Sequence, residues 1–236
     1  MKYLIFTVLF LWSIHQLNAQ ANDPTSQKTA NTLNRAQVRP HQRVYTSPVP
    51  KGDLKGSPYL FDEWKKGLIT MNEKDEVYTV DSMRLDGLNQ ELDVYTEGQV
   101  KAISGFLIKK ISFVDNYGQI DLINLLNFSF EGTKLKGFGQ VLASGKLSLL
   151  KRTVFSFKES NYNVALNVGD RSDAIFKKDE YYLLNEKEEM TRIKSKKELQ
   201  LYFQSNERMQ KFLEENKFNV KQEESLIALV NYFNQS

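Results

Sequence analysis

The chain contains no cysteine, and its 2 histidines, His15 and His41, both lie before residue 42. Without cysteine there is no disulfide and no thiol to carry a lipid anchor, so stability must come from packing. The region after residue 57 has neither histidine nor cysteine. That absence excludes Ser–His–Asp and Cys–His catalysis there, together with the usual zinc, copper and haem sites. Carboxylate, Ser–Lys and tyrosine chemistry remain open, as do oxygen-ligand calcium or magnesium sites.

Proline is also scarce, and neither sign of charge is in large excess. All 5 prolines precede residue 60, and the formal net charge of the 236 residues is +3. Positive and negative side chains alternate along the chain without a basic block, so nothing indicates a nucleic-acid partner. With 15 Phe and 11 Tyr the chain has enough large apolar side chains for a core, which excludes disorder throughout.

The first residues have the pattern of an export signal. Lys2 gives the positive start, residues 3–14 form a short apolar run, and Ala19 and Ala21 are small residues of the kind that signal peptidase requires. The run is too short for a comfortable membrane span. We therefore expect residues 1–21 to be a signal peptide. We also expect the protein to be exported, to the periplasm or the medium, and to have no membrane span after cleavage.

Residues 22–57 are rich in Asn, Gln, Ser, Thr and Pro and read as a linker. At the entrance to the folded region stand Tyr59, Phe61 and Trp64. The sequence predicts a packing anchor in which Trp64 is substantially buried. The alternative is a binding surface made of these three side chains, for a sugar or a peptide.

From residue 58 to 194 the sequence is a succession of short apolar runs with polar turns between them. Residues 67–71 and 77–80 flank one turn, and residues 144–146 form another. In residues 91–95, alternation places Leu92 and Val94 on one face and the carboxylates of Glu91 and Asp93 on a solvated one. The charged residues 177–180 are interpreted as a turn between two strands. Residues 120–130 fit either strand or helix.

The last segment, residues 195–236, changes to a helical period. Ser195 and Glu198 have the spacing of a capping box, in which Ser195 accepts from the Glu198 N–H and Glu198 reaches back. Three short amphipathic helices follow, the last with an apolar stripe of Leu226, Leu229, Val230 and Phe233. The predicted fold is α+β or mainly β: a meandering antiparallel sheet, as a sandwich or a partly open barrel, on which the C-terminal amphipathic helices pack.

Several short segments resemble catalytic or ligand-binding motifs but differ from them in spacing or in structural context. Residues 137–142 begin like a dinucleotide fingerprint, yet the third glycine is Leu142. Ser148 and Lys151 have the spacing of a penicillin-interacting enzyme, but on a strand they face opposite sides. The oxygen-rich segments 115–118 and 169–173 are turns without calcium-loop spacing. Asn127-Phe128-Ser129 is a glycosylation sequon inside an apolar run.

One resemblance is carried by longer stretches of sequence. These are residues 56–67 (GSPYLFDEWKKG), residues 145–150 (GKLSLL), residues 181–184 (YYLL) and residues 217–226 (KFNVKQEESL). Together with the export signal they resemble the small uncharacterised exported proteins of Bacteroidota over residues 56–236. The resemblance implies an envelope or secreted location and carries no catalytic residue or cofactor.

The expected function is that of a non-enzymatic exported envelope protein, acting as an interaction or structural module with no cofactor or metal. Its partner is unknown, with another envelope protein or an apolar ligand as the options. The first alternative is a carrier of an apolar, lipid-like ligand, which requires a large dry cavity. The second is a carboxylate-dependent hydrolase, which requires two acids facing one cleft and a raised pKa.

Overall fold

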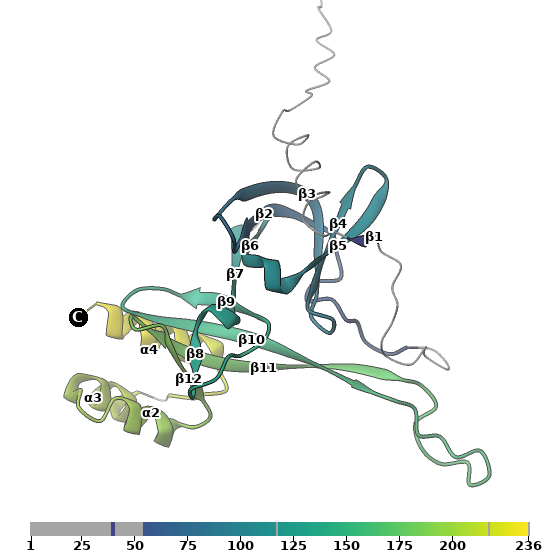
Figure 1. Cartoon of the computed structure of the whole chain (residues 1–236). Coiled ribbons are helices and arrows are strands. Elements are labelled where there is room, and N and C mark those ends of the chain that lie inside the picture. Colours follow the sequence, from purple (N-terminus) through teal and green to yellow (C-terminus); the bar gives the residue numbers. More distant parts are fainter. Residues whose placement is uncertain (1–38, 41–53, 117, 217, 236) are drawn as a thin grey trace, which may run out of the picture.

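The computed structural model describes residues 39–40, 54–116, 118–216 and 218–235 of the chain, so the predicted signal peptide lies outside the described residues. The described strands form one open sheet in the order β1-β5-β4-β3-β2-β6-β7-β9-β10-β11-β12-β8. Each neighbouring pair is antiparallel except β12 and β8. Three helices follow β12, the last strand in the sequence (Figure 1). The predicted fold, mainly antiparallel β with C-terminal helices, is confirmed.

The first part of the sheet is a curved meander around its own core. The core consists of apolar side chains from β2 to β7, with Ile69, Met83 and Ile111 fully buried. Two 3₁₀ turns, η1 (Gly105–Leu107) and η2 (Leu125–Asn127), join strands in this part. The strands are β1 (Arg39–Pro40), β2 (Lys65–Met71), β3 (Val77–Asp86), β4 (Glu91–Thr96), β5 (Gln99–Ser104), β6 (Ile108–Asp115) and β7 (Gly118–Asn124).

The second part of the sheet is dominated by one long hairpin. Its two strands have 12 residues each and pair along their whole length, from Leu147–Asn185 to Lys158–Ala174. The strands of this part are β8 (Ser129–Phe130), β9 (Phe138–Ala143), β10 (Leu147–Lys158), β11 (Ala174–Asn185) and β12 (Glu189–Ile193).

The helices cover the base of this hairpin. They are α2 (Lys196–Tyr202), α3 (Glu207–Glu215) and α4 (Glu223–Asn234). Leu226, Leu229 and Val230 are fully buried against β9, β10 and the other helices, as the stripe predicted. At the end of α4 the Asn234 side chain accepts from the Leu147 N–H and donates to the Leu147 C=O, over 3.0 and 2.8 Å.

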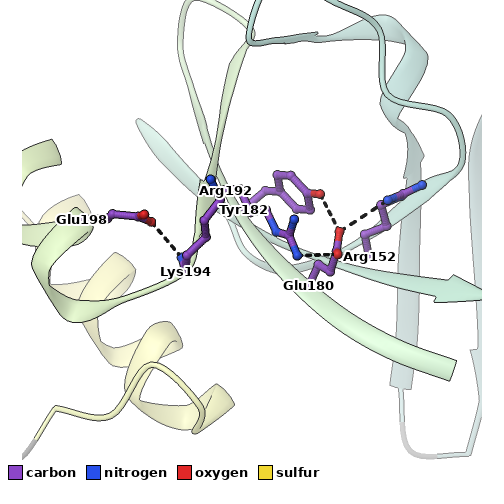
Figure 2. A network of polar contacts seen from close by, with 6 residues as sticks. All are labelled: Arg152, Glu180, Tyr182, Arg192, Lys194 and Glu198. Carbon is purple, nitrogen blue, oxygen red and sulfur yellow. Dashed lines mark hydrogen bonds and ion pairs between the residues drawn. The ribbon is translucent and has the colours of Figure 1, made fainter.

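The capping box is present with one change. Ser195 Oγ accepts from the Glu198 N–H, whereas Glu198 reaches back to the N–H of Lys194, one residue earlier than expected (Figure 2). The first bond satisfies a donor that the first turn of α2 would otherwise leave without a partner, and the second ties Glu198 to the residue before the N-cap.

One assignment from the sequence is wrong, and one that it left open is decided. Residues 177–180 are not a turn but the middle of β11, because each pairs with a residue of β10. Pairing with β10 overrides the local charged composition there. The run 120–130, which fitted either strand or helix, divides into β7, the 3₁₀ turn η2 and the two-residue strand β8.

Candidate functional site

The aromatic cluster at the entrance is divided between interior and surface. Tyr59 is buried, and its hydroxyl donates to Asp93 Oδ2 over 2.9 Å. Phe61 packs edge-on against Phe113 with ring centroids 5.5 Å apart. Trp64 is 37% exposed, so the expectation of substantial burial was wrong. Tyr59, Phe61 and Trp64 therefore do not form one continuous surface.

Arg84 accounts for this division. Its guanidinium stacks 3.4 Å from the centroid of the Tyr59 ring and 4.4 Å from that of Trp64. The same group lies 3.8 Å from the carboxylate of Asp93, whose side chain is 1% exposed. The face of β4 that was expected to be solvated is thus covered by the entrance segment and by Arg84. What remains outside is a small pair, Trp64 with Tyr95 edge-on at 6.3 Å.

The motifs that resembled chemistry have structural roles. Lys151 forms an ion pair with Glu223 of α4 at 2.8 Å, so it is not poised beside Ser148. A Cβ on Gly145 would lie 2.5 Å from the Asn234 side chain, which explains a glycine in that turn. Asp173 accepts from the backbone N–H of Ser160 and is buried. Among the described residues, no group of three or more acidic or histidine side chains could hold a metal ion.

Two carboxyl groups, those of Asp121 and Asp170, have a clearly shifted pKa, and both shift downward. Ion pairs and hydrogen bonds lower the pKa of Asp121 and of Asp170, against the raised pKa that a general acid needs. Burial opposes the downward shift at Asp121, and the bonds to Ser112 and Lys110 outweigh it. At Asp170 the hydrogen bond to Lys158 is the main cause.

Two concavities of the described part of the chain differ in size and openness, and neither is a large closed apolar chamber. A cavity of about 20 Å³ lies between Gln90, Phe138 and Arg152, which is room for about one water. An open groove of about 430 Å³ has a mixed lining, in which Lys109 and Lys110 lie beside Ile123 and Phe128. Both lysines already form ion pairs, with Asp75 and Asp121.

The feature with the clearest outward role is the far half of the β10–β11 hairpin. Beyond the pair Arg152–Glu180, six more residue pairs extend the two strands, a length of about 20 Å. Near the root, Phe155 packs against Gly87 at the end of β3, whereas Figure 1 shows the outer end of this half projecting beyond the helices and the first seven strands. We call residues 153–179 the arm. The outer end of its two strands is braced where the Lys55 N–H donates to the Asp173 C=O and the Ile175 N–H donates to the Lys55 C=O.

The arm leaves the body of the sheet at a network of charged side chains (Figure 2). Glu180 accepts from Arg152, Arg192 and the hydroxyl of Tyr182, which come from three neighbouring strands. The register brings them together, since Arg152 pairs with Glu180 and Arg192 with Tyr182. Burial, and then the bond to Glu180, raises the pKa of Tyr182 to about 12. The network fixes the direction in which the arm projects.

The tip of the arm is an ordered loop. Asn163 and Val168 close it as a pair, and the Leu166 N–H donates to Asn163 Oδ1. The hydroxyl of Tyr162 donates to Asn167 Oδ1, and Arg171 donates to both of these side-chain oxygens. Asn167 has φ of 51°, a left-handed conformation that Asn tolerates better than most residues.

With its polar side chains bonded to one another, the loop presents aliphatic ones to solvent. Val164 is 81% exposed, Leu166 68% and Val168 56%. They belong to a run of nine uncharged residues, 161–169, in a chain in which 26% of residues are charged. Sequence reasoning missed this tip, although the uncharged run between two polar segments was visible. Single exposed aliphatic residues are ordinary, whereas three on one projecting loop indicate a contact surface.

No family model, curated protein or solved structure matches this chain. The resemblance to exported proteins of Bacteroidota therefore stays a prediction. Within the described residues no helix has the length and apolar character needed to cross a membrane.

Proposed function

We propose that this chain is a non-enzymatic exported envelope protein that acts as an interaction module, and that the arm carries the contact. The observation behind the proposal is the tip, where Val164, Leu166 and Val168 are exposed on a loop at the projecting end of the hairpin. Burying one Val or Leu side chain contributes about 1.5–3 kcal/mol relative to leaving it in water. A partner that covers all three side chains would therefore gain several kcal/mol of binding free energy.

The body of the protein supports this role by holding the arm. Glu180, Arg152 and Arg192 join three strands at its root, and the segment at Lys55 braces the outer end of its two strands. The alternatives named from sequence have less support. The concavities found offer no apolar chamber for a lipid carrier, and the acidic groups with shifted pKa values shift in the wrong direction for a hydrolase.

The test replaces all three tip residues, as Val164→Ser, Leu166→Ser and Val168→Ser in one chain. Cells of the native host are fractionated, and the protein is followed in the envelope and soluble fractions. We expect the wild type with the envelope and the triple variant in the soluble fraction. N-terminal sequencing of the recovered protein tests removal of residues 1–21 in the same experiment, with a new N-terminus near Gln20 or Asn22.

A matched control removes three equally exposed apolar side chains elsewhere. Val77, Phe106 and Leu201 are 57–59% exposed and lie outside the arm. Their triple serine variant should fractionate like the wild type. Both variants should melt within a few degrees of the wild type, because exposed positions change stability by about 0.5 kcal/mol or less. If the tip variant partitions like the wild type, the arm is not the contact and the proposal fails.

A further inference from the structure

We infer that the tip of the arm inserts into the interfacial region of a lipid bilayer. This inference rests on the proposed function of the arm and names its partner. It draws on three properties of the arm: the kind of apolar side chain it presents, the internal bonding of its loop, and its balance of charge.

The exposed side chains favour lipid over a protein partner. Val164, Leu166 and Val168 are all aliphatic. The residues that dominate protein–protein contacts are Trp, Tyr and Arg, and Leu and Val are under-represented among them. The Tyr and Arg of this loop, Tyr162 and Arg171, are stacked on each other at 4.4 Å and bonded to Asn167. The Tyr and Arg of the loop are therefore bonded within it, and the apolar side chains that it presents beside its exposed Asn residues are all aliphatic.

The side-chain oxygens of the loop also meet a condition for entering an apolar phase. A polar group that loses water must find a partner within the protein. Here Asn161 Oδ1 accepts from the Asp170 N–H over 2.8 Å, and Asn163 Oδ1 accepts from the Leu166 N–H. Asn167 accepts from Tyr162. The side-chain oxygens that would resist dehydration at the tip are already occupied.

Charge sets how the tip would bind. Residues 161–169 carry none. The nearest charged residues are Glu159 and Asp170, and Asp170 forms an ion pair of 2.6 Å with Lys158. Along the whole arm the cations Lys158, Arg171, Lys177 and Lys178 equal the anions Glu159, Asp170, Asp173 and Asp179 in number. An arm without net charge has no preference for anionic headgroups. Binding should then be hydrophobic and nearly independent of salt.

The experiment uses the absence of cysteine in the chain. Val164→Cys gives the full-length protein a single thiol at the tip, which is labelled with an environment-sensitive fluorophore. Leu201→Cys on α2, a position 59% exposed in the wild type, gives the control label. Each protein is titrated with phosphatidylcholine vesicles. A label at the tip reports on the tip itself, whatever another part of the chain does at the vesicle.

We expect the emission of the tip label to rise and shift to the blue, with no change for the label on α2. Adding Leu166→Asp to the tip-labelled protein should raise the half-saturating lipid concentration about tenfold or more, whereas Leu166→Phe should preserve binding. Anionic phosphatidylglycerol in the vesicles, or salt raised from about 50 to about 500 mM, should change that concentration by less than about twofold.

Three results would overturn the inference. The tip label fails to respond to vesicles, both labels respond equally, or binding requires phosphatidylglycerol and disappears in salt. The proposed function is judged separately. If the tip label ignores lipid but the triple serine variant still leaves the envelope fraction, the arm contacts a protein and only the lipid inference falls. If the triple variant also stays in the envelope, both fall.

Discussion

At the scale of single residues, the largest energetic consequences belong to polar side chains that the strands bury. Asp93 is the clearest case, since its side chain is 1% exposed and it holds both Tyr59 and Arg84. Alternation along β4 correctly placed Leu92 and Val94 in the core. It could not show that the opposite face would be covered, because the covering segment, residues 58–64, comes from a different part of the chain.

Replacing Asp93 by Ala should lower the free energy of unfolding by about 3–5 kcal/mol, because it leaves the half-buried Arg84 guanidinium and the buried Tyr59 hydroxyl without their carboxylate. Urea unfolding of the purified protein measures the change. Glu97 is the matched control, as it also pairs with a cation, Lys101, but is 57% exposed. Glu97→Ala should cost less than about 1 kcal/mol. Equal losses in the two variants would contradict the buried network.

The corrected position of Trp64 changes what its removal should do. A fully buried Trp would cost about 3–5 kcal/mol on truncation to Ala, whereas a side chain 37% exposed and held by one stacked Arg should cost less. The sequence could not separate these cases, since a cluster of aromatics and acids describes an anchor and a surface equally well. The decisive partner, Arg84, lies 20 positions further along the chain.

Tyr182 predicts how stability depends on pH at the alkaline end. Burial and the bond to Glu180 raise its pKa in the folded protein to about 12, whereas the unfolded chain titrates near 10. The stabilising contribution is therefore complete below pH 10 and is lost as pH rises from about 10 to 12, because the unfolded state releases its proton first.

The free energy of unfolding of the wild type should fall across that range, and Tyr182→Phe should fall less steeply. Urea unfolding at a series of pH values gives both slopes. Tyr181, with its pKa also raised to about 12 by burial and Glu223, keeps part of the slope in the variant. Parallel curves for the two proteins would show that Tyr182 does not carry the effect.

At the scale of elements, the C-terminal helices were readable because their period is local. The spacing of apolar residues in α4 predicted its buried face, and Leu226, Leu229 and Val230 lie there. The sequence could not foresee the two bonds between Asn234 and the backbone of Leu147, which depend on the close approach of the Gly145 turn. Strand lengths in the sheet were harder, since β11 contains four charged residues that local composition assigns to a turn.

Deleting everything after Glu224 should expose the core beneath α4. A helix of 12 residues is marginal alone in water, so its stability comes from docking. Three fully buried side chains at about 1.5–3 kcal/mol each are a large share of the 5–15 kcal/mol that a domain has. Limited proteolysis and thermal melting should show a protease-sensitive, aggregation-prone protein. Leu229→Ala, expected to cost about 2–5 kcal/mol, tests the same face without truncation.

At the scale of the whole molecule, the three core clusters stabilise the body of the sheet, and the arm presents exposed side chains outside them. One cluster fills the first meander, and the other two lie on both sides of the hairpin base. None of the three clusters contains a residue of the arm. A sequence analysis that searches for core residues and catalytic motifs passes over such a segment, because its apolar residues are few and its function lies in their exposure.

This division predicts that the tip can be removed without harm to the fold. Joining Ser160 to Asp170 through Asn-Gly, in place of residues 161–169, should leave the free energy of unfolding within about 0.5 kcal/mol of the wild type. The excised residues contact mainly one another and the flanking Asp170 and Arg171, and a shorter loop costs slightly less entropy to close. Thermal melting and urea unfolding give the comparison.

A second variant on the same hairpin shows where the arm stops being dispensable. Asp173 is 5% exposed and accepts from the Ser160 N–H, next to the backbone bonds with Lys55. Asp173→Ala should therefore cost about 1–3 kcal/mol, because it leaves a buried N–H without a partner. If excising the tip destabilised the protein as much as Asp173→Ala does, the loop would be part of the folded body. Its exposed Val and Leu side chains would then need a structural explanation in place of the contact proposed for them.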